Sequence, residues 1–386
     1  MSFDVLLHAV MLRRALTGIG HYTSRLAAGL EQHPDIGKVL YFHRFTSSPT
    51  QPRQVKPVPW QDKTKQHVRR VPIVGDLYYG LRRLSFKLTS RRCGADLYHE
   101  PNYLLMPFDG PSVVTIHDLS YLHYPQYHPK DRIHRMEKGM PHTLRRADHL
   151  ITDSEYVRKE LMELLGVPAD KVTAIVLGVD STFRPLSPKE CAPTLARYGL
   201  EGLRYLLALG TLEPRKNISG LIAAYSRLPG KIQDAHPLAL VGMRGWLSDP
   251  LERQIEPLKR RGRLRVLGYV PSDDLPFLYG GAHGFAFPSF YEGFGLPPLE
   301  AMACGVPTLI SDRSCLPEVA GDVALQVDPE DVEAMAGGLE RLISDAAFRA
   351  NARKAGPQRA ARFTWEKCVD STVGVYRKVL PRCRLG

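Results

Sequence analysis

Long hydrophobic runs are missing from this chain of 386 residues. A transmembrane helix needs about 20 consecutive, mostly apolar residues, and no apolar segment of the chain approaches that length. The N-terminus leads straight into the apolar segment 5–7 without a basic flank, which indicates a buried strand and no signal peptide. These absences predict a soluble protein of the cytoplasm.

Cysteine pairs and the common catalytic motifs are missing as well. The six cysteines form no Cys-x-x-Cys pair and no zinc-ligand spacing, which suits a reducing compartment. Walker A, His-Glu-x-x-His and Gly-x-Ser-x-Gly motifs do not occur. The sequence therefore offers no P-loop, no helical zinc-protease site and no serine nucleophile on a strand-to-helix turn. We expect neither a metal nor a cofactor.

Apolar runs of strand length alternate with helical patterns along the whole chain, which predicts parallel sheets covered by helices. The length is too great for one ordinary core and suits two domains, and the proline-punctuated stretch 183–188 is the candidate linker. We predict an α/β protein with two Rossmann-like domains, 1–183 and 189–364, whose sheets face an interdomain cleft, and a helical segment 365–386 able to cross back to the first domain. The expected strands are 5–10, 39–42, 97–99, 113–117, 149–152, 172–177, 204–209, 238–241, 265–270, 284–288 and 308–311, and the clearest helices are 217–228 and 298–304.

The net charge of +12 is distributed unevenly. Residues 53–92 hold eleven lysines and arginines against two aspartates. Their second part has the pattern of an amphipathic helix, with Leu77, Leu81, Leu84 and Leu88 on one stripe and Arg82, Arg83, Lys87 and Arg91 opposite. Three interpretations stay open: a surface helix with a solvated basic face, electrostatic contact of 53–92 with an anionic membrane, and nucleic-acid binding. No recognition motif accompanies the charge, so we expect no nucleic-acid partner.

The most informative segment, 287–300, contains two glutamates separated by seven residues, Glu292 and Glu300. A strand ends near its start, a glycine-bearing loop follows, and two prolines suit the first turn of a helix. Ligands of parallel sheets bind at the carboxyl ends of strands; here Gly293 and Gly295 let a ligand approach the backbone, and the helix start offers N–H groups to an anion. The two carboxylates suit the hydroxyl groups of a sugar and a ribose. The alternative is one solvated glutamate and one capping glutamate.

Two adjacent cations, Arg215 and Lys216, follow another strand end in the same domain. An arginine holds two phosphate oxygens at once and a lysine acts as a point charge, so the pair is a candidate diphosphate clamp. Asn217 is a good cap for the helix that follows. Neighbouring surface cations are common, and it is the position at a strand end that makes this pair informative.

The first domain contributes a second group of candidates. Gly18 and Gly20 form a Gly-x-Gly turn after the first strand, but Thr23 replaces the third glycine of a dinucleotide fingerprint, so NAD and FAD are not expected. His117 also follows a strand and is either a structural histidine or part of the site. The segment 98–103 lies at a similar strand end and is a candidate lining of an acceptor pocket.

Together these residues resemble family 4 of the retaining glycosyltransferases, which have the GT-B fold. The resemblance covers nearly the whole chain and rests on Gly18-Ile19-Gly20, His117, the 153–154 region, the 210–217 turn and the paired glutamates of 292–300. It implies that the first domain binds the acceptor and the second the nucleotide-sugar donor. No Asp-x-Asp occurs, so the usual metal site of the other major glycosyltransferase architecture is absent from the sequence.

The resemblance also implies roles for single residues. The side chains of Arg215 and Lys216 would bind the diphosphate, Glu292 the donor sugar and Glu300 the ribose, and His117 would approach the sugar. The backbone of Gly293, Phe294, Gly295 and Leu296 would donate to sugar and phosphate, and Gly18 and Gly20 would flank the phosphates. Much of the family has an arginine directly after the strand-terminal glycine, where this chain has Thr211. In this interpretation Arg215 supplies that charge.

The implied reaction is a retaining, metal-independent transfer in which the leaving diphosphate helps to accept the proton of the incoming hydroxyl. The Gly-Thr-Leu-Glu-Pro-Arg-Lys-Asn turn at 210–217 is similar to that of bacterial polysaccharide mannosyltransferases. It favours GDP-mannose or GDP-rhamnose as the donor and a lipid-linked polysaccharide such as O antigen as the acceptor, with the enzyme peripheral on the inner face of the plasma membrane. The alternatives are a nucleotide-sugar 2-epimerase, against which the paired glutamates argue, and a basic interaction protein without catalytic activity.

Overall fold

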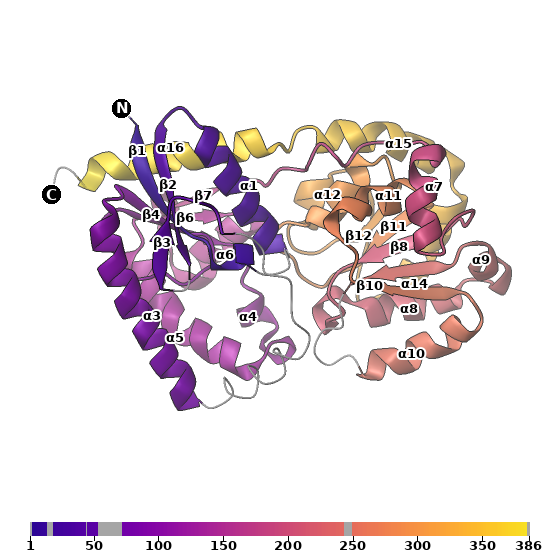
Figure 1. Ribbon diagram of the computed structural model, residues 1–386. Helices are drawn as coiled ribbons and strands as arrows, with labels where there is room; N and C mark the ends of the chain where they lie inside the picture. Colours follow the sequence, from indigo (N-terminus) through magenta and orange to yellow (C-terminus); the bar gives the residue numbers. More distant parts are fainter. Residues whose placement is uncertain (1, 14–17, 44, 53–71, 243–248, 384–386) are drawn as a thin grey trace. The chain divides into compact units, whose positions relative to one another are not determined.

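The structure is a computed structural model that describes residues 2–13, 18–43, 45–52, 72–242 and 249–383. The chain divides into two compact units, in each of which helices flank a sheet (Figure 1). Unit 1 comprises Met1–Leu119, Lys130–Leu177 and Trp365–Gly386, and unit 2 comprises Ser120–Pro129 and Gly178–Thr364. Within the described ranges, no helix is both long enough and apolar enough to cross a membrane.

Unit 1 contains a seven-stranded sheet with the strand order β3-β2-β1-β4-β5-β6-β7. The strands are β1 (Phe3–His8), β2 (Ile36–His43), β3 (Thr46–Ser48), β4 (Leu97–Glu100), β5 (Ser112–Ile116), β6 (His149–Thr152) and β7 (Val172–Ala174). Neighbouring strands are parallel, except that β2 and β3 are antiparallel. Val5, Leu6 and Leu7 of β1 are fully buried, as expected for a strand covered on both faces.

The helices of unit 1 include a segment from the far end of the chain. They are α1 (Gly18–Gln32), α3 (Pro72–Cys93), α5 (Lys130–Arg146), α6 (Glu155–Leu165) and α16 (Trp365–Cys383). On α16, the hydroxyl of Tyr376 lies 2.6 Å from Nδ1 of His99, and its ring meets Phe3 edge-on. Gly29 of α1 makes room for α16, because a Cβ at this position would overlap the side chain of Val369.

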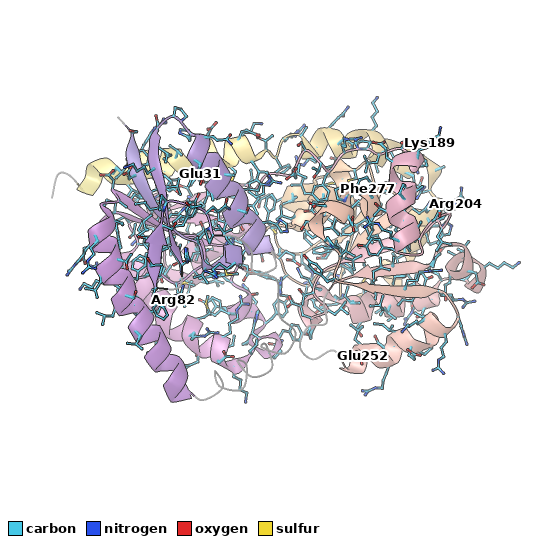
Figure 2. The ribbon with its side chains drawn as sticks, viewed as in Figure 1. Glu31, Arg82, Lys189, Arg204, Glu252 and Phe277 are labelled. Atoms are coloured by element: carbon cyan, nitrogen blue, oxygen red, sulfur yellow. The ribbon has the colours of Figure 1, made fainter. Side chains whose placement is uncertain are left out.

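Helix α3 presents leucines to the solvent. Leu81, Leu84 and Leu88 are 53%, 56% and 50% exposed. The face toward the sheet carries the buried Phe86 and also Arg82, labelled in Figure 2, which hydrogen-bonds to His8 of β1. The interpretation of this segment as a surface helix with a solvated basic face therefore does not account for the exposed leucines. Residues 53–71 of the basic region lie outside the described part of the chain.

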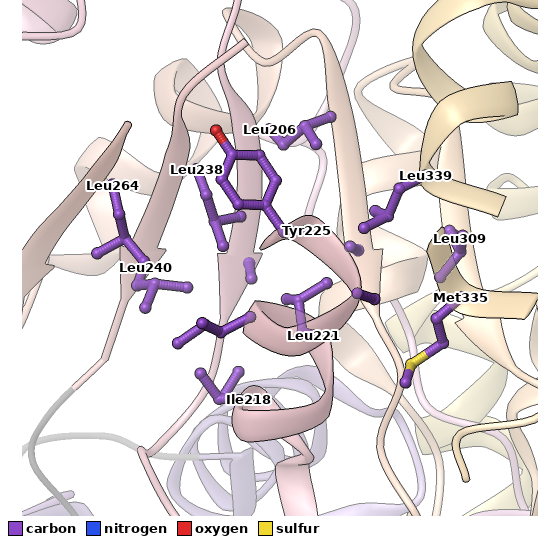
Figure 3. Packing of buried hydrophobic residues seen from close by; sticks show 14 of the residues in the cluster. Leu206, Ile218, Leu221, Tyr225, Leu238, Leu240, Leu264, Leu309, Met335 and Leu339 are labelled. Carbon is purple, nitrogen blue, oxygen red and sulfur yellow. The ribbon is translucent and has the colours of Figure 1, made fainter. Parts of the chain in front are cut away.

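Unit 2 contains a six-stranded, wholly parallel sheet with the order β10-β9-β8-β11-β12-β13. The strands are β8 (Leu206–Leu209), β9 (Leu238–Val241), β10 (Leu264–Gly268), β11 (Gly284–Phe287), β12 (Thr308–Ser311) and β13 (Leu325–Val327). The helices are α4 (Ser120–His123), α7 (Pro188–Arg197), α8 (Ile218–Arg227), α9 (Gly230–Ala235), α10 (Asp249–Arg260), α11 (Leu275–Gly280), α12 (Leu296–Ala303), α13 (Leu316–Ala320), α14 (Val332–Ser344) and α15 (Ala346–Ala360). Leu221 and Tyr225 of α8, Leu240 of β9 and Leu339 of α14 meet in one apolar core (Figure 3).

The predicted α/β fold with parallel sheets in two units is confirmed. Segments 149–152, 238–241 and 308–311 are strands with the predicted bounds. The short strands β3 and β13 are not among the predicted ones.

The two compact units differ in two places from the domain boundary predicted at 183. Segment Ser120–Pro129, inside the predicted first domain, belongs to unit 2. There the rings of His123 and Tyr291 lie 5.1 Å apart, and those of Tyr124 and Tyr291 lie 6.1 Å apart. Unit 2 then resumes at Gly178, ahead of the prolines. Contacts between residues far apart in the sequence decide this grouping, and no local pattern reveals them.

Candidate active site

The loop between β11 and α12 carries the first of the two predicted glutamates. Gly295, which precedes α12, has φ +109°, and a Cβ there would lie 2.7 Å from the side chain of Leu316, so both backbone and packing require glycine. Pro297 and Pro298 carry no N–H group. In the first turn of α12, therefore, only Leu296 could donate to an anion. The loop, more than the helix, is where a phosphate would find backbone donors.

Lys216 and Glu292 form the centre of the site in unit 2. The Nζ atom of Lys216 donates to Oε1 of Glu292 over 2.6 Å, and NH1 of Arg215 lies 3.2 Å from Oε2. The side chains of Lys216 and Glu292 are only 14% and 10% exposed. Burial opposes ionisation of Glu292, but the charges of Lys216 and Arg215 outweigh it and hold the pKa of this carboxyl below its usual value. The ammonium also lies 5.1 Å from the ring centroid of Phe287, the last residue of β11.

Arg215 connects the turn after β8 to the loop after β11. Its NH1 donates to the carbonyl oxygen of Tyr291 over 2.5 Å, and its NH2 donates to Glu213 over 2.8 Å. Its own carbonyl oxygen accepts from the N–H of Phe290 over 3.0 Å. The turn is fixed further by Asn217, which has φ +53° and whose side chain caps α8. Arg215 thus holds the two predicted segments together, and its contact with a diphosphate stays a prediction.

Glu300 has different surroundings from Glu292. It lies on α12 and accepts a hydrogen bond of 2.9 Å from the hydroxyl of Tyr279 on α11. Burial raises its pKa to about 7, so this carboxyl titrates near neutral pH. The alternative of one solvated and one capping glutamate is wrong, because Glu292 is buried in an ion-pair cluster and the residue that caps α12 is Gly295.

Two residues that the sequence did not predict hold the backbone of Glu292. The N–H of Glu292 donates to Oγ of Ser314 over 3.0 Å. The thiol of the buried Cys315 lies 3.2 Å from the carbonyl oxygen of Glu292 and 3.0 Å from that of Phe294. Ser314 has φ +55°, an uncommon conformation for a residue other than glycine. Their position just after β12 was the signal that could have found them, because side chains at such strand ends gather at one edge of the sheet.

In unit 1, the predicted His117 is held on both sides of its ring. Nδ1 lies 2.7 Å from Oδ2 of Asp153, and Nε2 lies 2.8 Å from the carbonyl oxygen of Pro101. Burial disfavours the charged ring, but the carboxylate of Asp153 outweighs it and raises the pKa of His117. Two acceptors favour an imidazolium that donates from both nitrogens. The ring edges of Tyr22 and Tyr103 complete the enclosure, and Tyr103 adopts φ +63°.

The glycine turn of unit 1 is described only in part. Residues 14–17 lie outside the described ranges, and Gly18 begins α1. A Cβ at Gly18 would meet no atom within 4 Å, so packing does not require glycine there. Gly20 is buried within α1. The segment 98–103 contributes His99 and Tyr103 to the buried interior of unit 1. Within the described ranges, no three His, Cys, Asp or Glu side chains gather to form a metal site.

Comparison with known proteins places the chain in a family. A model described as "Glycosyltransferase Family 4" matches residues 16–183, and one described as "Glycosyl transferases group 1" matches residues 196–359. The O-antigen chain mannosyltransferase B of Escherichia coli is 40% identical over 374 residues, which are 95% of this chain and 97% of that protein. The O-antigen chain mannosyltransferase RfbU of Salmonella typhimurium is 25% identical over 88% of this chain and 92% of its own length.

Solved structures agree on the fold. The sucrose-phosphate synthase of Thermosynechococcus elongatus has a TM-score of 0.75 at 23% identity and covers 98% of this chain and 100% of its own. WaaG, a glycosyltransferase involved in lipopolysaccharide biosynthesis, has a TM-score of 0.69 at 14% identity and covers 96% and 99%. At these identities the likeness establishes the architecture alone. With the family matches, it shows that the chain is a glycosyltransferase of family 4 with the GT-B fold.

Proposed function

We propose that this glycosyltransferase transfers a hexose from a GDP-sugar to a lipid-linked surface polysaccharide such as O antigen. GDP-mannose is favoured over GDP-rhamnose, because the relative that is 40% identical is named an O-antigen mannosyltransferase. The observation that carries the proposal is the buried cluster of Lys216, Arg215 and Glu292 at the carboxyl ends of two neighbouring parallel strands. Such an edge is where parallel α/β sheets bind ligands.

In this proposal the diphosphate binds beside Lys216. An ammonium group has three hydrogen-bond donors, so Lys216 can keep its bond to Glu292 and still donate to a phosphate oxygen. The N–H groups of Gly293, Phe294, Gly295 and Leu296 are the proposed backbone donors. Glu292 orients the sugar, and Glu300 accepts from the ribose hydroxyls. Arg215 supports the site mainly by holding Glu292, which refines its expected role as a diphosphate ligand.

The proposed reaction is substitution at the anomeric carbon with retention. The bond between that carbon and the diphosphate breaks, and the bond to the acceptor oxygen forms on the same face. The proton of the acceptor hydroxyl passes to the leaving diphosphate. Negative charge develops on the diphosphate as the bond breaks, and Lys216 with the loop N–H groups stabilises it. These steps need no metal, and we propose that the reaction is metal-independent.

Unit 1 is proposed to bind the acceptor, and Gly18, Gly20 and His117 are proposed to contribute to the donor's phosphates and sugar. The ring nitrogens of His117 already bond to Asp153 and Pro101. We therefore propose that His117 acts as a fixed positive charge and not as a proton acceptor. Because the proposed acceptor is lipid-linked, the enzyme works as a peripheral protein on the inner face of the plasma membrane, with residues 53–92 toward the lipid.

The test is a donor screen with the full chain in the presence of EDTA, using GDP-mannose, GDP-rhamnose, UDP-glucose and dTDP-rhamnose. We expect turnover and thermal stabilisation with a GDP-sugar, and NMR of the product is expected to show that the anomeric configuration is kept. A response to UDP- or dTDP-sugars alone would overturn the donor, and inversion would overturn the reaction course. Free sugar released as the 2-epimer without an acceptor would indicate an epimerase. Neither turnover nor thermal stabilisation with any of the donors would favour a non-catalytic protein.

A further inference from the structure

The outward face of α3 is apolar, although the helix belongs to a water-facing layer of unit 1. Leu81, Leu84 and Leu88 lie at spacings of three and four residues, on one stripe. Each is at least half exposed. The opposite side of the helix provides the core contact, because Phe86 is fully buried and its ring lies 4.8 Å from that of Phe42. The three leucines therefore do not contribute to the core of unit 1, and their exposure needs another explanation.

A second apolar side chain adjoins the same helix. Phe45 is 45% exposed. Its carbonyl oxygen accepts from the hydroxyl of Ser85 over 2.6 Å, which fixes it beside α3. An exposed aromatic residue therefore has its backbone next to α3.

Cations line one edge of the leucine stripe. Arg83, Lys87 and Arg91 follow one another at intervals of four residues, and Lys87 and Arg91 lie three residues after Leu84 and Leu88. Arg91 is 58% exposed and pairs with Asp109 over 2.7 Å. The side chains of this stripe are long and exposed enough to reach a phosphate while their stems cover apolar surface.

Helix α5 continues the positive charge beyond α3. Arg145 and Arg146 occupy its last turn, and both are exposed. Burial lowers the pKa of His142, and the charges of Arg83, Arg146 and Arg145 lower it further. The three guanidinium groups of two helices therefore lie close enough to act on one imidazole. Arg83 of the α3 stripe therefore lies near the arginines that end α5.

We propose that the α3 face, defined as Leu81, Leu84 and Leu88 with Arg83, Lys87 and Arg91, inserts into the surface of an anionic membrane. The leucines enter the boundary between headgroups and acyl chains, and the cations bind lipid phosphates. This inference rests on the proposed lipid-linked acceptor and deepens it by naming the surface that carries the contact. It differs from purely electrostatic docking, because the leucines contribute a component that salt does not screen.

Charge complementarity selects lipid over a second copy of this chain. Two α3 faces brought together would place Arg83, Lys87 and Arg91 of both copies in one interface, and like charges in an interface are unfavourable. An anionic bilayer offers hydrocarbon to the leucines and phosphates to the cations at the same depth. A combination of apolar insertion with a basic patch is also what stable peripheral binding requires.

The test is co-sedimentation of the full chain with vesicles of phosphatidylethanolamine and phosphatidylglycerol, at low and high salt. One variant removes the leucines (Leu81→Ser, Leu84→Ser, Leu88→Ser), and a second removes the charges (Arg83→Gln, Lys87→Gln, Arg91→Gln). Leu164→Ser is the matched control, because Leu164 is 52% exposed on α6 and lies outside the face. We expect the leucine variant to lose affinity roughly tenfold or more at both salt concentrations. The charge variant should lose affinity mainly at low salt, and the control should bind like the parent.

Vesicle binding by the leucine variant equal to that of the parent overturns the proposal. So does a parent that is dimeric by light scattering and becomes monomeric in the leucine variant, since the leucines then cover a second copy. GDP-mannose turnover, measured in detergent with a soluble acceptor, should be equal in the parent and the leucine variant. If no protein turns over any donor but vesicle binding still depends on the leucines, the proposed function fails and the docking surface stands.

Discussion

The Nζ atom of Lys216 lies 2.6 Å from Oε1 of Glu292, and the two side chains are almost entirely buried. The pair joins the turn after β8 to the loop after β11, and these strands are neighbours in the sheet of unit 2. A buried ion pair that loses one partner leaves the other charge uncompensated. The effects of substitutions at Lys216, Arg215 and Glu292 are therefore coupled, and activity has to be read together with stability.

Lys216→Met is expected to lower kcat with GDP-mannose by about 10²–10³, the usual cost of removing one donor from a site where negative charge develops. Glu292 keeps Arg215 as a partner in this variant, so the fold should survive with a small drop in Tm. Steady-state kinetics and thermal unfolding measure the two effects. A normal kcat in this variant would show that Lys216 does not belong to the active site.

Arg215→Met is expected to lower Tm more, and kcat less, than Lys216→Met does. It leaves Glu213 and Glu292 with one cationic partner fewer and breaks the bond to the carbonyl of Tyr291. Breaking a buried ion pair from one side costs about 3–5 kcal/mol, so Tm should fall well below that of Lys216→Met. If the two variants have equal Tm values and Arg215→Met loses more kcat, Arg215 binds the diphosphate directly.

The sequence predicts this site well because of a rule of parallel sheets. Strand ends in one sheet meet at one edge, so the cations at 215–216 and the glutamate at 292 could be expected together although Lys216 and Glu292 are 76 positions apart in the sequence. Ser314 is not predicted, because serine as a residue type gives no signal and only its position after β12 points to the site. Asp153 was included only as part of a resemblance, and its bond to His117 depends on the pairing of β5 with β6.

Helix α3 shows the limit of periodicity. The pattern separates leucines from cations correctly, but it does not say which side faces the sheet. One aromatic residue decides the orientation: Phe86 packs against Phe42 and Tyr98, and the three leucines 81, 84 and 88 are left outside. A pattern of amphipathicity identifies a face, and only tertiary contacts assign it to core or to solvent.

Glu300 should make donor binding depend on pH. Its pKa of about 7 lies above the usual value because desolvation in its partly buried position disfavours the charged carboxylate. Only the ionised form accepts ribose hydroxyl hydrogens with both oxygens, so the affinity for GDP should weaken as pH falls through 7. Glu300→Gln should bind GDP weakly at every pH. Calorimetric titration of GDP between about pH 6 and 8, one unit either side of the pKa, measures this. A flat profile for the parent would contradict the assignment.

The same carboxyl should limit stability. A group whose pKa is raised by folding stabilises the protein below its unfolded pKa, and this stabilisation is lost as pH rises through the folded pKa. The burial of Glu300 therefore costs stability above pH 7. Glu300→Gln keeps an acceptor for Tyr279 without the charge, and its Tm at pH 8.5 is expected to exceed that of the parent, with little difference near pH 5, where the parent carboxyl is protonated. If the parent has the higher Tm at pH 8.5, the charged form of Glu300 does not destabilise the folded protein.

Asp153→Asn is expected to lower the pKa of His117. The carboxylate is what keeps the ring protonated against its burial. With a neutral amide in its place, the neutral ring becomes more favourable: Nε2–H still donates to the carbonyl oxygen of Pro101, and Nδ1 accepts from the amide NH2. NMR of the imidazole measures the pKa, and kcat is expected to fall with it. His142 is the internal control in the same spectra, since its neighbours are arginines. An unchanged His117 pKa would show that Asp153 does not set its charge.

Cys315 is expected to act on the site through the backbone that it holds. Its thiol reaches the carbonyl oxygens of Glu292 and Phe294, the two residues that bracket a proposed phosphate-binding N–H group. Cys315→Ala removes that contact and should raise KM for GDP-mannose several-fold, because the loop N–H groups are then less well oriented for the diphosphate. Cys315→Ser retains a donor and should recover most of the affinity. Cys368→Ala is the control for loss of a buried thiol, since Cys368 lies on α16 in unit 1. A purely structural role would lower Tm in Cys315→Ala and leave KM unchanged. A rise in KM that Cys315→Ser reverses would show that the thiol supports donor binding.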